Sequence, residues 1–187
     1  IMTDMISPLD WGPVSLVRRN HGLEHATINL LSEKYPTRSF AGHSDSKGFW
    51  ILGNVSTDEL AETVQQALAR MSAGEHNLAI HAHCGTNAVT TGVVAGTLAW
   101  LATLRNANTF KKKLDRWSWV VMLVTGGVIL SQPLGPLVQK KITTSGVPAG
   151  LKVVQIVRYE RENPDRPVAH RIQTKDSTQV TVETSAA

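Results

Sequence analysis

Two histidines and a glutamate near the start of the chain have the spacing of a metal site. They are His21, Glu24 and His25, within the run His-Gly-Leu-Glu-His. Residues four apart on a helix project from the same face, so the two imidazoles can share one ion, with the carboxylate on the same side. The spacing fits the zinc-binding pattern His-x-x-Glu-His, in which zinc lowers the pKa of a bound water and the carboxylate acts as general base. Two solvated histidines on a helix would have the same spacing.

A second group of metal-binding residue types lies at residues 81–84, where the sequence reads His-Ala-His-Cys. We expect this group at the end of a strand, so that His81 and His83 point to one side and Cys84 to the other. We predict Cys84 as the third zinc ligand, because a thiolate binds zinc tightly and the chain has a single cysteine. The alternatives are that Cys84 is an inert buried thiol, and that His81 and His83 support the ligands or lie at the surface.

The residues around these motifs predict a small unit of mixed helix and sheet. Apolar residues recur at helical spacing from Leu16 to Tyr35, which places both histidines of the first motif on a helix. Two short strands are expected within 39–55, and Ser56 with Glu59 has the spacing of a capping box that opens a second helix. A short strand at 78–82 follows. The expected fold is an α+β plait with the order helix, strand, strand, helix, strand.

Two uncharged apolar stretches predict a transmembrane helical hairpin. They cover residues 87–104 and 117–139. At about 1.5 Å per residue the second exceeds the ~30 Å hydrocarbon core of a bilayer, and the first barely reaches it. Gly92 and Gly96 have the small-xxx-small spacing that allows close helix contact, so other membrane subunits or a homodimer are expected partners besides the lipid bilayer. A buried hairpin of a soluble protein is the alternative.

The basic residues favour a membrane surface over nucleic acid. The formal net charge is +4, and the sequence pI is about 9.4. The densest basic run lies at residues 105–116, in the expected loop between the two apolar stretches. Because the positive charge gathers there, no nucleic-acid partner is expected.

Membrane topology stays open, because two indications conflict. The positive-inside tendency would place the 105–116 loop in the cytoplasm. Lys140, Lys141 and Lys152 lie beyond the second apolar stretch, and no signal peptide is evident within residues 1–13, which favours soluble parts that stay inside. The numbering opens on Ile, which leaves open whether residues precede it.

The chain after the second apolar stretch is β-like. Its segments of alternating apolar and polar residues are 151–159, 168–174 and 179–184. A membrane hairpin would return this tail to the side of the first unit, so we expect its strands to extend that sheet or to pack on it. The predicted parts are a metal-binding unit at 1–86, the hairpin at 87–139 and the β-rich tail at 140–187.

The order of these motifs resembles that of S-ribosylhomocysteine lyase (LuxS), within the wider fold of inverted-motif metallopeptidases. In that family a His-x-x-Glu-His helix is followed by a Gly-Cys-x-Thr-Gly-[Phe/Tyr] strand, a helix, and a Cys-Gly pair that completes the zinc site. The matching stretches here are 21–25, 42–49 and 84–86. The resemblance implies an α/β plait with a helix-borne metal site against a small sheet. It implies zinc ligands at His21, His25 and Cys84, and an acid/base at Glu24.

This chain departs from the family in three respects. His43 stands where the family has its catalytic cysteine, so thiol chemistry is absent, although His43 can still move protons. The long N-terminal strands that supply substrate contacts in the family have almost no counterpart before Arg18. LuxS itself is soluble, whereas several bacterial membrane proteins look similar in joining such motifs to transmembrane helices. The resemblance therefore carries the metal site and the fold and leaves the substrate open.

Two functions follow from the sequence. The first is a zinc-dependent hydrolase or lyase at a membrane surface, with Glu24 and His43 as the catalytic candidates. The second is a non-catalytic accessory subunit of a larger membrane complex, with a structural or vestigial zinc site and a hairpin that docks through Gly92 and Gly96. A closed site with four protein ligands favours the second function, and an open position beside Glu24 favours the first.

Overall fold

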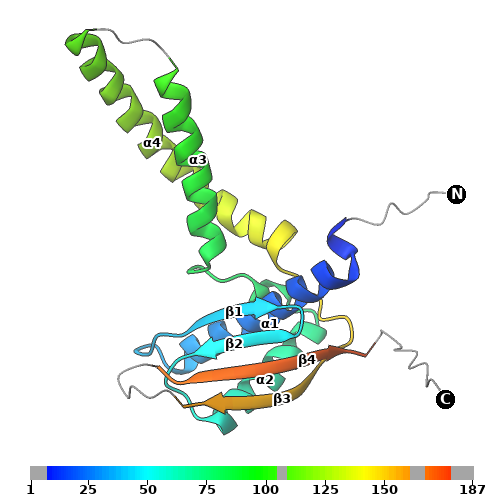
Figure 1. The fold of residues 1–187 in the computed structure, drawn as a ribbon. Coiled ribbons are helices and arrows are strands. Elements are labelled where there is room, and N and C mark those ends of the chain that lie inside the picture. The colour runs from blue at the N-terminus through cyan, green and yellow to red at the C-terminus, as the bar shows by residue number, and fades with distance from the viewer. Residues whose placement is uncertain (1–7, 105–108, 161–166, 178–187) are drawn as a thin grey trace, which may run out of the picture. The chain divides into compact units, whose positions relative to one another are not determined.

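The chain folds into helices and one antiparallel sheet. The computed structural model describes residues 8–104, 109–160 and 167–177 (Figure 1). Over these residues the sheet contains four strands, and long α-helices alternate with short helical turns. The predicted α+β class is confirmed.

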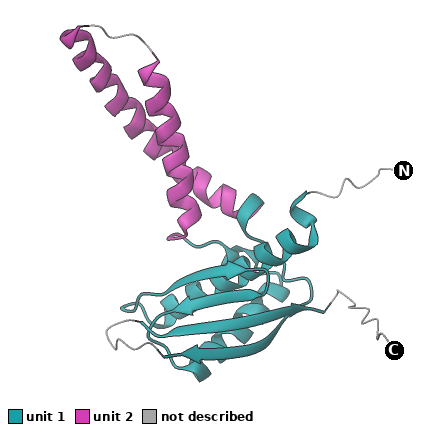
Figure 2. Ribbon diagram, in the orientation of Figure 1, with its two compact units in different colours: residues 1–81, 142–187 teal, residues 82–141 magenta. Residues whose placement is uncertain are grey.

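Two compact units divide the chain. One joins residues 1–81 to residues 142–187, and the other comprises residues 82–141 (Figure 2). Strand β4, Ala169–Asp176, pairs with strand β2, Gly48–Leu52. The C-terminal part of the chain therefore shares a sheet with the N-terminal part.

The first unit opens with a 3-10 turn, η1, at Pro8–Asp10, and a long helix, α1, over Gly12–Lys34. The helix ends at Lys34, and its C-cap, Tyr35, lies immediately before Pro36. The proline ring disfavours helical backbone in the residue before it, which explains this end. The helix predicted over 16–35 is confirmed, and it begins one turn earlier. The central turns of α1 are buried, so both histidines of the motif lie where the helix packs against other parts of the fold.

The sheet has the strand order β1-β2-β4-β3, and every neighbouring pair is antiparallel. β1 covers Ala41–Asp45 and β3 covers Leu151–Tyr159. The strands expected at 151–159 and 168–174 are confirmed as β3 and β4. The segment expected at 179–184 lies outside the described residues.

Helix α2, Thr57–Ser72, begins at the predicted capping box. The backbone N–H of Glu59 donates to the Ser56 hydroxyl oxygen at 3.3 Å, and that hydroxyl donates to the Glu59 carboxylate at 3.1 Å. These bonds satisfy groups that a helix start would otherwise leave without a partner. α1 and α2 cover one face of the sheet (Figure 1) and enclose the apolar core. Its fully buried members include Leu23, Leu31, Phe49, Ile51, Leu60, Met71 and Ile172.

The strand predicted at 78–82 is wrong. The chain there forms a 3-10 turn, η2, at His76–Ala79, and continues without regular structure to the start of the next helix. The Asn29 side-chain amide donates to the carbonyl oxygens of Leu78 and Ile80, at 2.9 Å each. A side chain of α1 thus takes the place of a neighbouring strand as hydrogen-bond partner. The prediction that the side chains of His81 and His83 point to one side and that of Cys84 to the other is therefore wrong, because it required a strand at these residues.

The second unit consists of two long helices. α3 covers Gly85–Thr103 and α4 covers Phe110–Val138, and α4 continues as a π-helical segment, η3, at Gln139–Thr143. The two helices pack against each other within the unit. The hydroxyls of Thr91 in α3 and Ser131 in α4 are 2.8 Å apart, so a hydrogen bond joins the two helices at this point.

The basic run between the apolar stretches is largely helical, so the loop expected over 105–116 is wrong in its second half. α4 begins at Phe110, and residues 111–116 lie in its first turns. The Thr109 hydroxyl caps this helix, because it accepts a hydrogen bond from the backbone N–H of Lys112 at 3.4 Å. Arg105 lies outside the described residues.

One helix in the described part of the chain is long and apolar enough to cross a membrane. It spans Phe110–Thr143 with a mean hydropathy of 1.6. This finding rests on length and composition. The first predicted span, 87–104, does not meet the same criterion, so two spans are not supported. Thr90, Thr91 and other small polar residues of α3 lower its hydropathy.

Candidate metal centre

The two histidines of the first motif lie side by side on α1. The ring centroids of His21 and His25 are 4.3 Å apart, and the ring planes meet at 62°. His25 is buried, with 2% of its surface exposed, and His21 is half-buried. The helical spacing read from the sequence therefore brings the two imidazoles together as expected.

Backbone carbonyls fix the orientation of both rings. Nδ1 of His21 lies 2.9 Å from the carbonyl oxygen of Thr143, and Nδ1 of His25 lies 2.8 Å from that of Ala79. A carbonyl oxygen only accepts hydrogen bonds, so each Nδ1 must be the donor. Each Nε2 then carries the lone pair that can bind a metal. Metal-binding histidines are commonly held by such a bond from the second ring nitrogen.

A third histidine, His81, is held in the same way. Its Nδ1 lies 2.6 Å from Oδ1 of Asn29, and its ring centroid lies 5.7 Å from that of His25. The Asn29 amide nitrogen donates to two backbone carbonyls, so its oxygen must face His81 and accept. His81 therefore also presents Nε2 as a lone-pair donor. The sequence signal for this contact is Asn29, which lies one helical turn after His25.

Cys84 stands at the start of α3, where its sulfur accepts from the backbone N–H of Thr86 at 3.4 Å. Ligand atoms of His21, His25 and Cys84 all lie within 4.8 Å of one another, so this group could hold a metal ion. The ligand set predicted from the sequence is thus gathered in space.

Glu24 is buried beneath strand β1. Only 3% of its surface is exposed, and its carboxylate accepts a hydrogen bond from the hydroxyl of Ser44. A Cβ at Gly42 would lie 2.6 Å from Cδ of Glu24, so a side chain there would force the Glu24 carboxylate to move. The strand is thereby shaped around the carboxylate of the motif.

His43 does not reach Glu24. Successive residues of a strand point to opposite faces, and Gly42 and Ser44 both face Glu24. His43 is exposed on the other face, opposite Trp50 in the β1–β2 pairing. The residue missed in the sequence is Ser44. The sequence pattern placed residues 42–47 in a polar turn, whereas Ser44 lies in β1, pairs with the buried Phe49 and shares its face.

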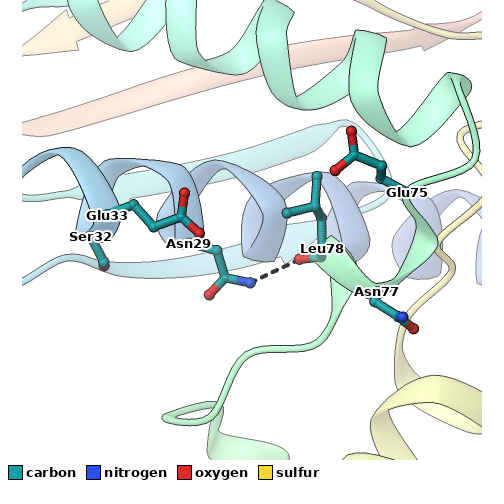
Figure 3. Close-up of a pocket in the computed structure, with 6 residues that line it drawn as sticks. All are labelled: Asn29, Ser32, Glu33, Glu75, Asn77 and Leu78. Carbon is teal, nitrogen blue, oxygen red and sulfur yellow. Dashed lines mark hydrogen bonds between the residues drawn. The ribbon is translucent and has the colours of Figure 1, made fainter.

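A groove lies along α1, with mostly polar residues among those that line it. It has a volume of about 580 Å³ and begins one helical turn beyond His25. Figure 3 shows the Asn29 amide donating to the carbonyl oxygen of Leu78 at its wall. Since Asn29 also holds His81, one side chain connects the groove to the histidine cluster. The lining residues are Asn29, Ser32, Glu33, Glu75, Asn77 and Leu78.

Residues 16–156 match a protein family described as a domain of unknown function, DUF6391. The chain belongs to this family. A relative described as an uncharacterized protein of Picosynechococcus sp. is 32% identical over 179 residues, which cover 87% of this chain and 82% of the relative. No solved structure matches the chain. The family match includes every residue of the candidate centre, from His21 to Thr143.

Proposed function

We propose that the chain is a membrane-associated zinc hydrolase, with His21, His25 and Cys84 as the metal ligands and Glu24 as the general base. One observation carries this proposal. Both ligand histidines donate Nδ1–H to fixed backbone carbonyls, so both present Nε2 as a lone-pair donor from neighbouring turns of one helix. Histidines that bind a metal are usually held by such a hydrogen bond from the second ring nitrogen, whereas two solvated surface histidines have no need of it.

The donor set favours zinc over other common metals. Two imidazole nitrogens and one thiolate suit zinc, whereas magnesium and calcium prefer oxygen donors. Three protein ligands leave a fourth position for water in a tetrahedral site, as in catalytic zinc sites. The family resemblance noted from the sequence implies the same three ligands.

The chain supplies the proton chemistry of a hydrolysis. Zinc, when bound, polarises a water molecule and lowers its pKa. Glu24 follows His21 by three residues on the same helix, so its carboxylate can accept the proton of that water. The Ser44 hydroxyl donates to Oε2 of Glu24 and holds the carboxylate in place from β1. Thiol catalysis is not proposed, because the single cysteine is assigned to the metal.

Membrane association is supported by α4, which meets the length and composition of a span. We further propose that α3 crosses the bilayer beside α4, so that the two helices form a hairpin with two spans. Large apolar side chains of both helices are exposed, which suits a lipid environment. Examples are Val89, Val93 and Trp100 of α3, and Trp119, Ile129 and Leu130 of α4.

Metal analysis of the purified full-length chain tests the centre. Wild type and Glu24→Gln are expected to retain about one equivalent of zinc, and Cys84→Ala and His25→Ala to lose it. His43→Ala is the matched control, because His43 is an exposed histidine on the far face of β1, and it is expected to retain zinc. Metal-free wild-type protein, or equal loss of zinc in the His43 variant, would contradict the assignment.

A structural zinc site in an accessory subunit is the second candidate function, and His81 favours it. Its ring lies 5.7 Å from that of His25, close enough for His81 to be considered as a fourth ligand that closes the site. Gly92 and Gly96 add to this view, since open space surrounds both, which leaves room for a partner helix. X-ray absorption at the zinc edge separates the two functions. Two nitrogens, one sulfur and one water oxygen support the hydrolase, and three nitrogens with one sulfur support the structural site.

A further inference from the structure

A second cavity of the first unit lies where β4 ends beside the turn between β1 and β2, and none of the proposed metal ligands lines it. Its volume is about 380 Å³, near the lower end of the range for cavities that bind small molecules. The turn and the strand are joined there, because the N–H of Thr174 donates to the carbonyl oxygen of Lys47 at 3.0 Å. The lining includes two lysines, two neutral polar residues and two apolar residues, namely Lys47, Lys175, Ser46, Gln173, Leu16 and Val154.

Positive charge gathers at this cavity. Lys47 and Lys175 line it, and Lys152 of β3 is directly opposite Lys175 in the β3–β4 pairing. All three lysines are exposed, and within the described residues none of their ammonium groups forms an ion pair. Like charges directly opposite on neighbouring strands destabilise a sheet. An anion bound here would therefore relieve a repulsion that the fold leaves in place.

The carboxylates near these lysines are already engaged elsewhere. Asp176, which also lines the cavity, is 7% exposed, and its Oδ2 lies 2.6 Å from Nη2 of Arg19. Asp45 precedes the turn, and its Oδ1 lies 2.8 Å from Nη2 of Arg171 and accepts from the backbone N–H of Lys47 at 2.7 Å. Both carboxylates are matched by an arginine, so the lysines give the cavity a net positive charge.

Buried side chains of α1 fix the shape of the cavity. Asn20 has no exposed surface. Its amide nitrogen donates to the carbonyl oxygen of Asp45 at 2.8 Å, and its amide oxygen accepts from the Thr174 hydroxyl at 2.6 Å. Arg19 holds Asp176 in the same way from the preceding position of the helix. A cavity whose walls are fixed before binding loses less conformational entropy when a ligand enters.

Two apolar residues complete the lining. The register between β3 and β4 shifts between Val153 and Gln155, and the residue at this irregularity, Val154, is 62% exposed. Irregularities of this kind re-aim a side chain out of the regular alternation of a strand. Leu16 of α1 is half-buried and lines the same cavity. The cavity therefore suits a ligand that joins an anionic group to a short apolar part.

We propose that this cavity binds a small phosphate monoester, with the phosphate at Lys47 and Lys175 and the apolar part of the ester against Leu16 and Val154. A phosphate monoester carries a charge of about −1.5 to −2 near pH 7, which several lysines match better than they match a single carboxylate. Lysine binds phosphate as a point charge, so no bidentate geometry is required. The volume suits a small soluble ester and not a two-chain phospholipid. The site is separate from the proposed metal centre and does not depend on it.

Calorimetric titration of the full-length chain in a non-ionic detergent, at low salt and pH 7, tests the site. The probe is butyl phosphate, and pentanoate and butanol are the matched compounds with a carboxylate or no charge. Butyl phosphate is expected to bind saturably, at least about fivefold more tightly than pentanoate, and butanol is expected not to bind. Lys47→Gln and Lys175→Gln should each weaken binding about tenfold, because each removes one charge-assisted contact. Lys34→Gln is the control, since Lys34 is an exposed lysine of the same unit that pairs with Glu59, and it should change binding less than about twofold.

Thermal unfolding of the same variants separates lost binding from lost folding. Without ligand, Lys175→Gln should melt at the wild-type temperature or above it, because the substitution removes the repulsion with Lys152. Butyl phosphate should raise the melting temperature of wild type and leave that of Lys175→Gln nearly unchanged. Cys84→Ala, which lacks one proposed metal ligand, should bind butyl phosphate as tightly as wild type.

Four results would overturn the proposal. They are folded wild type that does not bind butyl phosphate, equal affinity for pentanoate, unchanged affinity in both lysine variants, and loss of binding in Cys84→Ala. The last result would move the phosphate to the metal centre. Dihexanoyl phosphatidic acid is the comparison for a lipid source of the phosphate. Tighter binding of this lipid than of butyl phosphate would overturn the small soluble ester as the ligand.

Discussion

Large apolar side chains have opposite surroundings in the two units. In the first unit Leu23, Leu31 and Phe49 have no exposed surface. In the second unit Trp100 is 61% exposed and Leu130 66% exposed. The same kind of residue thus builds an interior in one region and an outer surface in the other.

The buried residues of α4 complete this contrast. They are Gly127, Ser131 and Gly135, which recur every four residues along one face of the helix. A Cβ at Gly127 would lie 2.7 Å from a methyl carbon of Leu98 in α3, so a small residue is required at the contact. Small residues inside and large apolar residues outside are the arrangement of helices packed in lipid. α2, which covers the sheet of the first unit, buries its large apolar residues instead.

The largest expected effect is that of truncating one phenylalanine in each unit. Phe49→Ala should lower the free energy of unfolding by about 3–5 kcal/mol, because it opens a cavity in the core. Phe110→Ala should change it by less than about 0.5 kcal/mol, because Phe110 is 82% exposed. Urea unfolding in detergent, followed by circular dichroism, measures both. Equal destabilisation by the two variants would contradict the difference in burial between Phe49 and Phe110.

A charge on the outer face of α4 tests whether that face meets lipid. Leu130→Lys should oppose membrane insertion by about 2.5–3.5 kcal/mol if the residue lies near the bilayer centre. The variant is expected to leave the membrane fraction of cells, whereas Leu130→Met should remain there. An unchanged distribution of the lysine variant would show that the exposed face is not in contact with hydrocarbon.

One glycine in each unit, when replaced by alanine, compares the packing of the two units at a single contact. A Cβ at Gly22 of α1 would meet the carbonyl oxygen of Ser145, which is backbone and cannot turn aside. Gly22→Ala should therefore destabilise the first unit by about 1–3 kcal/mol. Gly96→Ala meets nothing within 4 Å and should be neutral or stabilising by up to about 1 kcal/mol, since alanine favours helix. Thermal unfolding of both variants in detergent decides this, and similar melting temperatures would contradict it.

The smallest expected effect is a pH dependence confined to the first unit. Burial, with a smaller contribution from the charge of Arg158, lowers the pKa of His170 below its ordinary value. The unfolded chain then binds the proton more readily than the folded chain. The contribution of His170 to stability is therefore complete above its unfolded pKa, about 6.5, and is lost as pH falls through the folded value.

Unfolding free energies between pH 7.5 and pH 5 should accordingly decrease for wild type. A His170→Gln variant should show a flatter profile over the same range, although its stability at pH 7.5 is lower. Parallel profiles for the two proteins would exclude His170 as the source of the pH dependence.

Much of the fold could be predicted from local patterns. The helix over 16–35, the capping box at Ser56 and the strand at 151–159 depend on neighbours in sequence, and each was found where expected. The segment at 78–82 could not be predicted. Its apolar residues resemble a short strand, but the partner of its carbonyls is the side chain of Asn29, about fifty residues earlier.

The sequence by itself determined the pairing of His21 with His25, because the repeat of a helix brings residues four apart onto one face. It also determined that Cys84 is the sole thiol available. Only the tertiary structure decided that Thr143 orients His21 across 122 residues, that Asn29 holds His81, and that Ser44 rather than His43 supports Glu24. The reason is physical: periodicity fixes the faces of single elements, whereas contacts between elements depend on how the folded chain packs them.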